Sequence, residues 1–243
     1  MSIPLFYTNS ILTPHSQCVL ETDEAFHAIK VLRMSQGDVL DITDGMGNRA
    51  RARILALSKR DCIAEIETLE TVKARIYRLH IAIAPTKNID RFEWFLEKAT
   101  ELGIEEITPL LCEHSERRTV KEDRCRKILL SAMKQSEQSW LPVLHPLTSF
   151  DKLVQKTDYQ GRYLAWCGTG QESHLAVVYP PGKDALLLVG PEGDFSEREV
   201  ALALAQQFVP VNLGPNRLRT ETAGLAACSM LNTINDIRQK YED

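Results

Sequence analysis

The chain has 243 residues, of which 44% are hydrophobic and 26% are charged, and this composition excludes a disordered, collagen-like or coiled-coil protein. No apolar run approaches the ~20 residues of a membrane-spanning helix, and the first residues lack the pattern of a secretory signal, so we expect a cytoplasmic protein. The formal net charge of −4 argues against a protein that coats nucleic acid indiscriminately, although a local basic patch could dock one RNA.

Short elements separated by turns fill the first 72 residues. Residues 24–34 predict a short helix with one apolar face. The residues expected on that face are Phe26, Ile29 and Leu32 (or Val31). Residues 31–57 are also typical of three strands joined by turns, with residues 44–48 as a hairpin connection. This spacing indicates a small antiparallel sheet or barrel.

From about Tyr77 onward, strands alternate with helices. The expected strands are residues 78–86, 105–111, 161–167, 184–190 and 209–214. The expected helices are residues 87–103, 121–138, 196–208 and 220–242. Several strands are apolar on both faces, which indicates a mostly parallel sheet covered by helices on both sides. We therefore predict an α/β fold, with one domain of residues 1–72 and a second of residues 73–243.

The turn after the strand 184–190 is the most informative. The strand runs directly into Gly190-Pro191-Glu192-Gly193, and Ser196 with Glu199 predicts a capping box at the start of the next helix. Glycines at the carboxyl end of a strand let a ligand approach the backbone, and open α/β sheets bind ligands at that end. A tight loop explains the same glycines without a ligand. The chain contains neither G-x-G-x-x-G nor G-x-x-x-x-G-K-[ST], so dinucleotide and P-loop binding lose support.

A second turn precedes the last helix. Thr220 is the expected N-cap of this helix, and Glu221 in the first turn interacts favourably with the helix dipole. Arg217 and Arg219 adjoin the same positive helix end, where a cation is unfavourable unless it faces solvent, a carboxylate or a bound anion. The two arginines are therefore what a purely structural interpretation of this turn leaves unexplained.

Arginines alternate with alanines in one predicted strand. Arg49, Arg51 and Arg53 are expected to project from a single strand face. Such a row suits phosphates, and a solvated strand face is the alternative interpretation. A second basic segment spans residues 114–127, but its interleaved acidic residues make a solvated helix face the default and RNA contact the alternative.

The cysteines and histidines predict no metal site. The six cysteines are scattered without a C-x-x-C pair, which indicates buried, reduced thiols and neither a zinc site nor a disulfide framework. The histidines show no ligand spacing, so packing or surface roles are expected for His27, His80, His114, His145 and His174.

Several separated motifs resemble one known family. They are HAIKVLRMSQGD and DGMGN, then KNIDRFEWFLEKATELGIEEITPL and SERR, and finally LLLVGPEGDFSEREV and LGPNRLRTETA. In this order the chain resembles, nearly end to end, the bacterial ribosomal RNA small-subunit methyltransferase E family, which methylates N3 of a uridine in 16S rRNA. The resemblance implies an N-terminal PUA-like β-barrel that binds RNA and a C-terminal SPOUT methyltransferase domain with a trefoil knot. It also implies S-adenosylmethionine as cofactor, no metal, and a homodimer.

The resemblance further implies roles for individual residues. One cofactor loop corresponds to Ala165-Trp166-Cys167. The residues expected to bind S-adenosylmethionine are Trp166, Gly190, Pro191, Glu192, Gly193, Leu213, Gly214, Asn216, Leu218, Thr222 and Ala223. Arg219 is the expected stabiliser of the uridine anion, and Glu221 is a candidate base or a residue that orients Arg219. The residues expected to bind RNA are Arg33, Arg49, Arg51, Arg53, Lys87, Arg91, Arg117 and Arg118.

The chain departs from the family pattern at the cofactor loops. Asn216 stands where the family commonly has arginine, and an arginine follows as Arg217. Asp194 stands where a third glycine is common.

Two other classes of function fit parts of the sequence. A non-catalytic RNA-binding ribosome assembly factor would keep the barrel and the arginine row, but its cofactor loops would be free to decay, whereas both are intact here. An α/β enzyme that binds a cofactor and acts on a small molecule is the other alternative. Titration with S-adenosylmethionine separates the first alternative from an RNA methyltransferase, and RNA dependence of methyl incorporation separates the second.

Overall fold

The fold is described from a computed structural model that covers residues 3–10, 12–58, 60–166, 168, 170 and 172–241. The chain divides into two compact units. The small unit comprises Met1–Ala74 and Leu130–Leu141, and the large unit comprises Arg75–Leu129 and Pro142–Asp243. Cys167, which the sequence analysis placed in a cofactor loop, lies outside the described residues.

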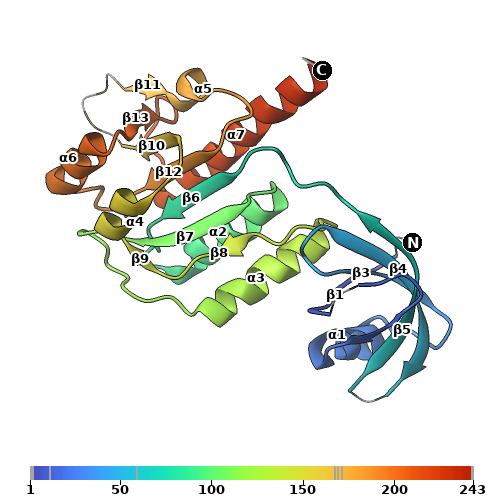
Figure 1. The fold of residues 1–243 in the computed structure, drawn as a ribbon. Helices are drawn as coiled ribbons and strands as arrows, with labels where there is room; N and C mark the ends of the chain where they lie inside the picture. Colours follow the sequence, from blue (N-terminus) through green and yellow to red (C-terminus); the bar gives the residue numbers. More distant parts are fainter. Residues whose placement is uncertain are drawn as a thin grey trace. The chain divides into compact units, whose positions relative to one another are not determined.

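A five-stranded sheet forms the small unit, with the order β1-β3-β4-β5-β2 (Figure 1). Its strands are β1 (Leu5–Tyr7), β2 (Gln17–Leu20), β3 (Val39–Thr43), β4 (Asn48–Leu57) and β5 (Cys62–Thr71). The β1–β3 pair is parallel and the other pairs are antiparallel. Residues 44–48 connect β3 to β4, which confirms the predicted hairpin; the Asp44 carboxylate accepts a hydrogen bond from the Met46 N–H at 2.8 Å.

Side chains alternate along β4 as the sequence predicts. Ala50, Ala52 and Ile54 are buried in the core of the small unit. Arg51 and Arg53 are exposed on the opposite face, because successive side chains of a strand point to opposite sides of the sheet. The predicted arginine row is therefore present on one strand face.

The predicted helix before β3 is confirmed, but its predicted apolar face is wrong. The segment forms an α-helix, α1 (Thr22–Phe26), that continues as one π-helical turn, η1 (His27–Val31). The π-helical turn holds more residues than an α-helical turn, so the side chains that follow rotate away from the face of a regular helix. Ala25 and Ala28 are fully buried, whereas Phe26, Val31 and Leu32 are exposed, and the strand predicted from residue 31 is absent.

The second stretch of the small unit packs on the hairpin between β3 and β4. The Gly47 N–H donates to the Ser139 carbonyl at 2.8 Å, and the Leu141 N–H donates to the Gly45 carbonyl at 2.9 Å. A Cβ on Gly47 would lie 2.5 Å from the Trp140 ring, so this glycine allows the close approach of the indole. Residues 130–141 are thus built into the small unit although they lie far along the chain.

The large unit contains an eight-stranded sheet in which every pair is parallel, which confirms the predicted α/β architecture. The strand order is β11-β13-β10-β12-β6-β7-β8, and β9 pairs with β7. The strands are β6 (Leu79–Ile83), β7 (Glu106–Leu111), β8 (Val143–Leu144), β9 (Thr148–Ser149), β10 (Gly161–Ala165), β11 (Ser173–His174), β12 (Ala185–Val189) and β13 (Val209–Asn212). Because β6 and β12 are buried along their whole length, both faces of the central sheet are covered.

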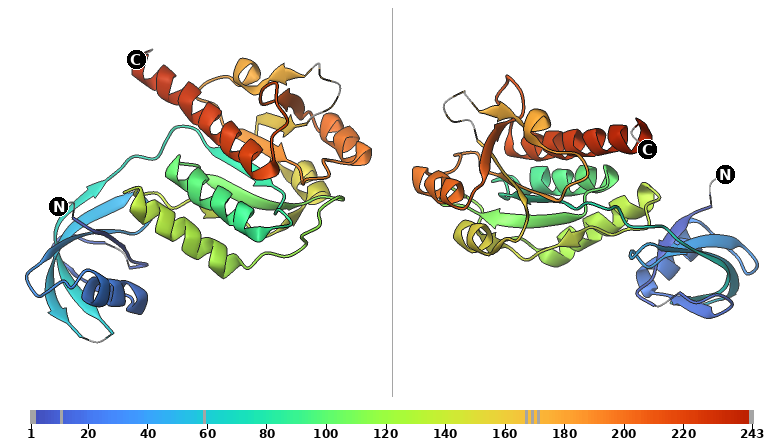
Figure 2. Two further views of the ribbon diagram at one scale, coloured as in Figure 1. Left: turned by 180° about the vertical axis from the view of Figure 1, so that it is seen from behind. Right: turned by 45° about the horizontal axis from the view of Figure 1, so that its top comes forward.

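Of the six helices described after β5, two pairs cover this sheet, one pair on each face. The helices are α2 (Ile89–Glu101), α3 (Glu122–Gln135), α4 (Phe150–Lys156), α5 (Leu175–Val178), α6 (Glu197–Ala205) and α7 (Thr220–Tyr241). Phe150 of α4 and Val200 of α6 share a core cluster with Ala82 and Leu188 from the sheet. Helices α2 and α7 lie side by side (Figure 2) and contact Ile83, whose side chain points to the other face. Within the described residues, no helix is long and apolar enough to span a membrane.

Gly224 marks the closest approach of α7 to the sheet. A Cβ at this position would lie 2.8 Å from Ile83 Cδ1 and 2.8 Å from Phe95 Cε2, and both neighbours are fully buried. Helix propensity alone predicts that Gly224→Ala stabilises the protein by about 0.8–1 kcal/mol. Overpacking of a buried site costs about 1–3 kcal/mol. We therefore expect Gly224→Ala to lower the midpoint of urea unfolding, whereas Ser229→Ala on the exposed side of α7 leaves it nearly unchanged. A higher midpoint for Gly224→Ala would contradict this packing.

The chain crosses the sheet between β13 and α7. Strand β13 lies beyond β10, whereas α7 packs on α2 and β6. Residues 213–219 therefore pass the carboxyl ends of β10 and β12, where the Gly190–Gly193 loop lies. The trefoil knot implied by the family resemblance requires this segment to thread through a loop, and the knot stays a prediction.

Candidate functional site

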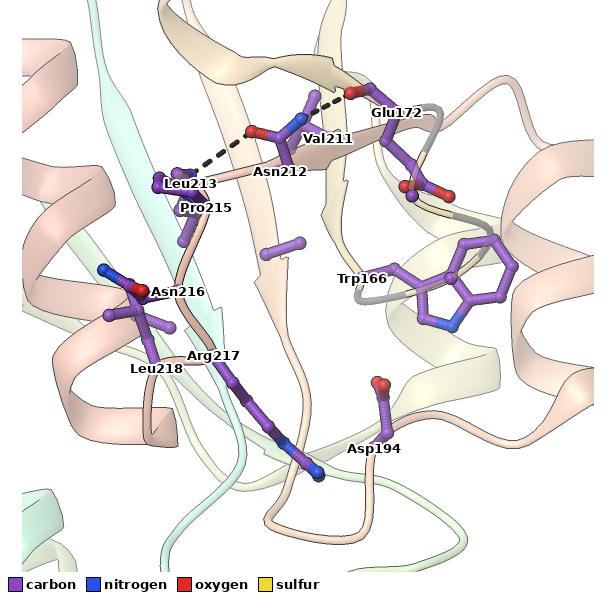
Figure 3. A pocket seen from close by; sticks show the side chains of 15 residues that line it. Trp166, Glu172, Asp194, Val211, Asn212, Leu213, Pro215, Asn216, Arg217 and Leu218 are labelled. Atoms are coloured by element: carbon purple, nitrogen blue, oxygen red, sulfur yellow. Dashed lines mark hydrogen bonds between the residues drawn. The ribbon is translucent and has the colours of Figure 1, made fainter.

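A cavity of about 680 Å³ opens at the carboxyl ends of β10 and β13 (Figure 3). Its lining comprises the end of β10 with Trp166, the approach to β11 with Glu172, residues 211–218 at and after the end of β13, and the single residues Asp194 and Ala223. A second cavity of about 270 Å³ lies along the Gly190–Glu192 loop and residues 217–220. The two cavities share Ala165, Asp194, Arg217, Leu218 and Ala223 and therefore form one continuous site. Their position agrees with the rule that open α/β sheets bind ligands beyond the carboxyl ends of the strands.

The Gly190–Gly193 loop is fixed by hydrogen bonds at both ends. The Glu192 carboxylate accepts a hydrogen bond from the Lys87 N–H at 3.1 Å. Behind the loop, Ser196 and Glu199 form the predicted capping box at the start of α6. Glu199 also accepts a hydrogen bond from the Glu113 N–H at 2.9 Å, which joins the cap to the segment after β7. The predicted capping box is confirmed, and it gives the loop a rigid base.

Asp194 occupies a backbone conformation that favours glycine. Its φ is +60°, in the left-handed region, which explains why a glycine suits this position. Aspartate is one of the residues that tolerates this region, and its own carboxylate accepts a hydrogen bond from the Phe195 N–H at 2.8 Å. The substitution therefore leaves the loop intact and adds a carboxylate to both cavities.

Thr220 joins the two glycine-bearing loops. Its hydroxyl donates a hydrogen bond to the Gly190 carbonyl at 3.0 Å, across 30 residues of sequence. The prediction that Thr220 caps α7 is therefore wrong, because this hydroxyl is used between loops and Thr220 is already the first residue of the helix. Thr220 is only 6% exposed, so the bond is shielded from water. This contact holds the loop after β12 against the start of α7.

Asn212 supports the wall of the larger cavity, and sequence reasoning missed it. Its side chain donates to the Glu172 carbonyl and accepts a hydrogen bond from the Gly214 N–H at 3.2 Å (Figure 3). Gly214 has φ of +129°, a conformation that L side chains rarely adopt. The sequence marks Asn212 only as a polar residue at the carboxyl end of a strand. Its partner at residue 172 becomes a neighbour only through the β11–β13 pairing.

Most of the predicted cofactor residues line this site. Those that do are Trp166, Gly190, Pro191, Glu192, Leu213, Gly214, Asn216, Leu218 and Ala223. Gly193 and Thr222 do not: Gly193 packs against His114, where a Cβ would lie 3.1 Å from His114 Cβ, and Thr222 is exposed on α7. Arg217 lines both cavities, and its side chain extends toward the side of the cavity where Asp194 lies (Figure 3).

The two predicted catalytic residues lie in different surroundings. Arg219 is exposed and lines the smaller cavity beside the Gly190–Glu192 loop. Among the described residues, no carboxylate pairs with its guanidinium. Glu221 is 7% exposed and lines neither cavity; its Oε1 lies 3.9 Å from Arg91 Nε, and its Oε2 has no hydrogen-bond partner in the described part of the chain. The structure thus places Arg219 at the site and pairs Glu221 with Arg91 instead of with Arg219.

The arginine row of the small unit is held by carboxylates. Arg49 and Arg51 both contact Asp41, at 2.9 and 3.1 Å, and Arg53 contacts Glu67 at 2.6 Å. The carboxylates neutralise part of the positive charge and fix the guanidiniums in one orientation. The fourth predicted RNA residue of this unit, Arg33, is exposed and has positive φ.

The predicted RNA residues of the large unit divide into two groups. The Arg117 guanidinium donates to the carbonyls of Thr86 and Lys87 at 3.0 and 2.8 Å, which braces the loop before α2. Arg91 pairs with Glu221. Glu116 lies 2.8 Å from the Lys87 ammonium and raises the pKa of this lysine. Arg118 is exposed. Arg117 and Arg91 are therefore engaged by the protein, whereas Lys87 and Arg118 keep their charged ends at the surface.

Two family models match the chain. The model of an RNA methyltransferase domain matches residues 73–232, and the model of an RNA methyltransferase PUA domain matches residues 20–67. A curated relative, ribosomal RNA small subunit methyltransferase E of Bacillus subtilis, is 30% identical over 224 residues, which are 86% of this chain and 87% of the relative.

Solved structures show the same fold over nearly the full length. The crystal structure of a probable rRNA methyltransferase from Porphyromonas gingivalis has a TM-score of 0.89 and 40% identity, covering 97% of this chain and 99% of that one. A ribosomal RNA small subunit methyltransferase E from Neisseria gonorrhoeae, bound to S-adenosylmethionine, has a TM-score of 0.87 and 28% identity, covering 96% of this chain and 98% of that one. The chain, with its PUA domain and its SPOUT-type α/β domain, belongs to the ribosomal RNA small subunit methyltransferase E family.

Proposed function

We propose that the protein transfers a methyl group from S-adenosylmethionine to N3 of a specific uridine in the 16S rRNA of the small ribosomal subunit. Its family makes it an S-adenosylmethionine-dependent rRNA methyltransferase, and the uridine and its N3 atom are the proposed refinement. One observation carries the proposal: the loops after β12 and β13, tied by the Thr220–Gly190 hydrogen bond, line two adjoining cavities that share five residues.

The cavity fits S-adenosylmethionine in size and chemistry. Its volume of about 680 Å³ is within the usual range for small-molecule sites. Trp166 and Leu218 supply apolar walls that suit an adenine ring, and the Asp194 carboxylate suits the positive charge of a sulfonium. A Cβ at Gly190 would lie 3.1 Å from the Phe195 ring, so a larger residue there would crowd the loop beside the ligand. When bound, the cofactor supplies an electrophilic methyl group and leaves as a neutral thioether.

The protein has to hold the uracil ring on the methyl axis and favour loss of the N3 proton, which passes to water at the site because the Glu221 carboxylate lines neither cavity. Orientation of two reactants can contribute about 7–11 kcal/mol. Arg219 is the residue we propose to stabilise the uridine anion. Its guanidinium, which pairs with no carboxylate of the described residues, lies before the α7 N-terminus and attracts the negative charge that develops on the carbonyl oxygens. A uracil stacked in an RNA duplex would not reach the cavity, so the target uridine is single-stranded or flipped out of the duplex.

We propose that the small unit binds the rRNA through the row of Arg49, Arg51 and Arg53. Arg51 and Arg53 are about half exposed, and each phosphate contact contributes about 0.7–0.9 to the slope of log affinity against log salt. We expect the double variant Arg51→Gln, Arg53→Gln to weaken binding to 16S rRNA. We also expect it to make that slope shallower by the amount that one to two phosphate contacts contribute. Arg60→Gln, in the turn between β4 and β5, is the matched control. Fluorescence anisotropy over a salt series measures both quantities, and an unchanged slope would remove the row from the interface.

We also propose that the protein acts in the cytoplasm as a homodimer that buries the outer faces of α2 and α7. Trp94 and Leu102 at α2 and Ile237 on α7 are 42%, 39% and 55% exposed, and the two helices pack together. An apolar surface of this kind is typical of a protein interface. Light scattering of the purified protein measures the mass in solution.

Analysis of 16S rRNA from cells with and without the gene tests the proposed reaction. N3 lies on the Watson–Crick edge of uracil, so an N3-methyl group blocks base pairing and stops primer extension. We expect the stop, and the matching mass shift in a nuclease digest, only when the gene is present. A modified base that does not stop primer extension would still show that the protein methylates rRNA, but it would refute N3 as the modified atom.

A further inference from the structure

A cluster of titratable side chains lies at the opposite edge of the sheet from the cavity. His80 is the second residue of β6, Glu106 is the first residue of β7, and His145 follows β8 directly. Their ligand atoms all lie within 4.8 Å of one another. In the sequence the two histidines stand alone, because 65 residues separate them. Parallel pairing of β6 with β7 and of β7 with β8 brings them together.

The Glu106 carboxylate divides its two oxygens between different partners. Oε1 accepts a hydrogen bond from the Tyr159 hydroxyl at 2.9 Å and lies 3.4 Å from Arg78 Nη1. Oε2 faces the two histidines, at 2.7 Å from His145 Nε2 and 3.9 Å from His80 Nδ1. One oxygen is thus held in place by the protein, and the other is directed at two imidazole nitrogens.

His80 presents a buried nitrogen without a partner. Its Nε2 forms a hydrogen bond with Thr108 Oγ1 at 2.7 Å, and its Nδ1 has no partner among the described residues. The side chain is 5% exposed, so the unpartnered nitrogen is shielded from water. When Nε2 carries the ring proton, the Nδ1 lone pair points toward the Glu106 carboxylate. In this tautomer Nδ1 and the Glu106 Oε2 are two lone-pair atoms that face each other in a buried site, an arrangement that a cation between them stabilises.

We propose that His80 Nδ1, Glu106 Oε2 and His145 Nε2 form a binding site for a divalent first-row transition cation such as Zn²⁺, with water completing the coordination. Two imidazoles and one carboxylate are a ligand set typical of zinc, and magnesium and calcium prefer oxygen ligands alone. Bond lengths of about 2.0–2.1 Å place tetrahedral zinc ligands about 3.3 Å apart. The two separations from Glu106 Oε2 are 2.7 and 3.9 Å, and the separation between the two imidazole nitrogens is within 4.8 Å, so an ion would draw the three ligands slightly together.

The surroundings of the cluster support a cation. Thr108 fixes the His80 ring through its distal nitrogen, as the hydrogen-bond partners of metal-binding histidines do. The nearest competing positive charge, Arg78, is engaged by Asp184 in two contacts of 2.8 and 3.0 Å. A bound ion would join β6, β7 and the segment after β8, and would therefore stabilise the large unit without taking part in methyl transfer.

Cobalt titration of the full-length protein, with any histidine tag removed, tests the proposal. We expect visible d–d absorption bands on addition of Co²⁺, without the charge-transfer band of a thiolate ligand, and displacement by Zn²⁺. Glu106→Gln and His145→Ala should each weaken Co²⁺ binding at least about tenfold and abolish the rise in melting temperature that Zn²⁺ produces in the parent. His145 is partly exposed, so its variant is expected to fold.

Two further variants sharpen the test. His27→Ala removes an exposed histidine of the small unit and should leave Co²⁺ binding unchanged. Thr108→Val keeps all three ligands but removes the partner of His80, and it should weaken binding about 10–100-fold while the bands remain. Absence of the bands in the parent, or bands of equal strength in Glu106→Gln and His145→Ala, would overturn the proposal. Either outcome leaves the methyltransferase proposal unaffected, because the two sites lie at opposite edges of the sheet.

Discussion

Arg219→Ala is expected to reduce methyl transfer to 16S rRNA by about 10²–10³-fold while binding of S-adenosylmethionine is retained. A loss of this size is typical when one preorganised group that stabilises developing negative charge is removed. Cofactor binding should persist because the larger cavity, with Trp166 and residues 211–218, does not include Arg219. Single-turnover methylation with tritiated cofactor measures the first quantity, and isothermal titration with the cofactor measures the second.

Two variants separate the role of the guanidinium from that of positive charge in general. Arg219→Lys keeps the charge but loses the planar donor group, so its rate should fall between those of the parent and Arg219→Ala. Arg118→Ala removes another exposed arginine of the large unit and should change RNA affinity more than the rate at saturating RNA. If Arg219→Ala keeps its rate within a few-fold of the parent, Arg219 does not stabilise the uridine anion.

Thr220→Val is expected to weaken S-adenosylmethionine binding about tenfold and to lower stability by about 1–3 kcal/mol, which is the cost of leaving a buried polar group without its hydrogen bond. The hydroxyl of Thr220 is the link between the Gly190 carbonyl and the start of α7. Without this link, the conformation in which both loops line one cavity is less populated, and apparent affinity falls with that population.

Thr220→Ser is the matched control, because it keeps the hydroxyl and removes only a methyl group. Its affinity and unfolding midpoint should lie much closer to those of the parent than the values of Thr220→Val. Equal cofactor affinity of the valine and serine variants would show that the interloop bond does not organise the site. Calorimetric titration and urea unfolding of the same preparations give both numbers.

The sequence predicts the large unit well because its signals are local. A short run of apolar residues between turn signals, such as residues 185–189, is typical of a strand buried on both faces. The capping box of Ser196 and Glu199 marks the start of α6. The turn of residues 44–48 is predictable for the same reason, because an aspartate and two glycines favour a tight turn through local hydrogen bonds and positive φ.

Features that depend on distant residues could not be predicted in this way. The π-helical turn at His27–Val31 changes which side chains of its helix are buried, and apolar periodicity assumes a regular helix. From the sequence, the hydroxyl of Thr220 is expected to cap a helix, because its actual partner, the Gly190 carbonyl, is 30 residues away in the chain. The His80 cluster exists only because two strand pairings bring its members to one sheet edge.

The parts of the candidate site that could be predicted are the loops that directly follow strands. Loops after β12 and β13 carry glycines that mark them in the sequence, and nine of the eleven predicted cofactor residues line the cavities. Asn212 and Glu172 could not be found because their contact depends on the short β11–β13 pairing. The pairing of Glu221 with Arg91 depends likewise on the packing of α2 against α7.

The discontinuous small unit sets a constraint on folding during synthesis. Met1–Ala74 leaves the ribosome long before Leu130–Leu141, whose backbone hydrogen-bonds to Gly45 and Gly47. The nascent β3–β4 hairpin therefore lacks its final partners until another 67 residues, from Ala74 to Leu141, have been translated. At about 5–20 residues per second this delay is roughly 3–13 s. During that interval the groove that accepts the Trp140 ring beside Gly47 is open to water.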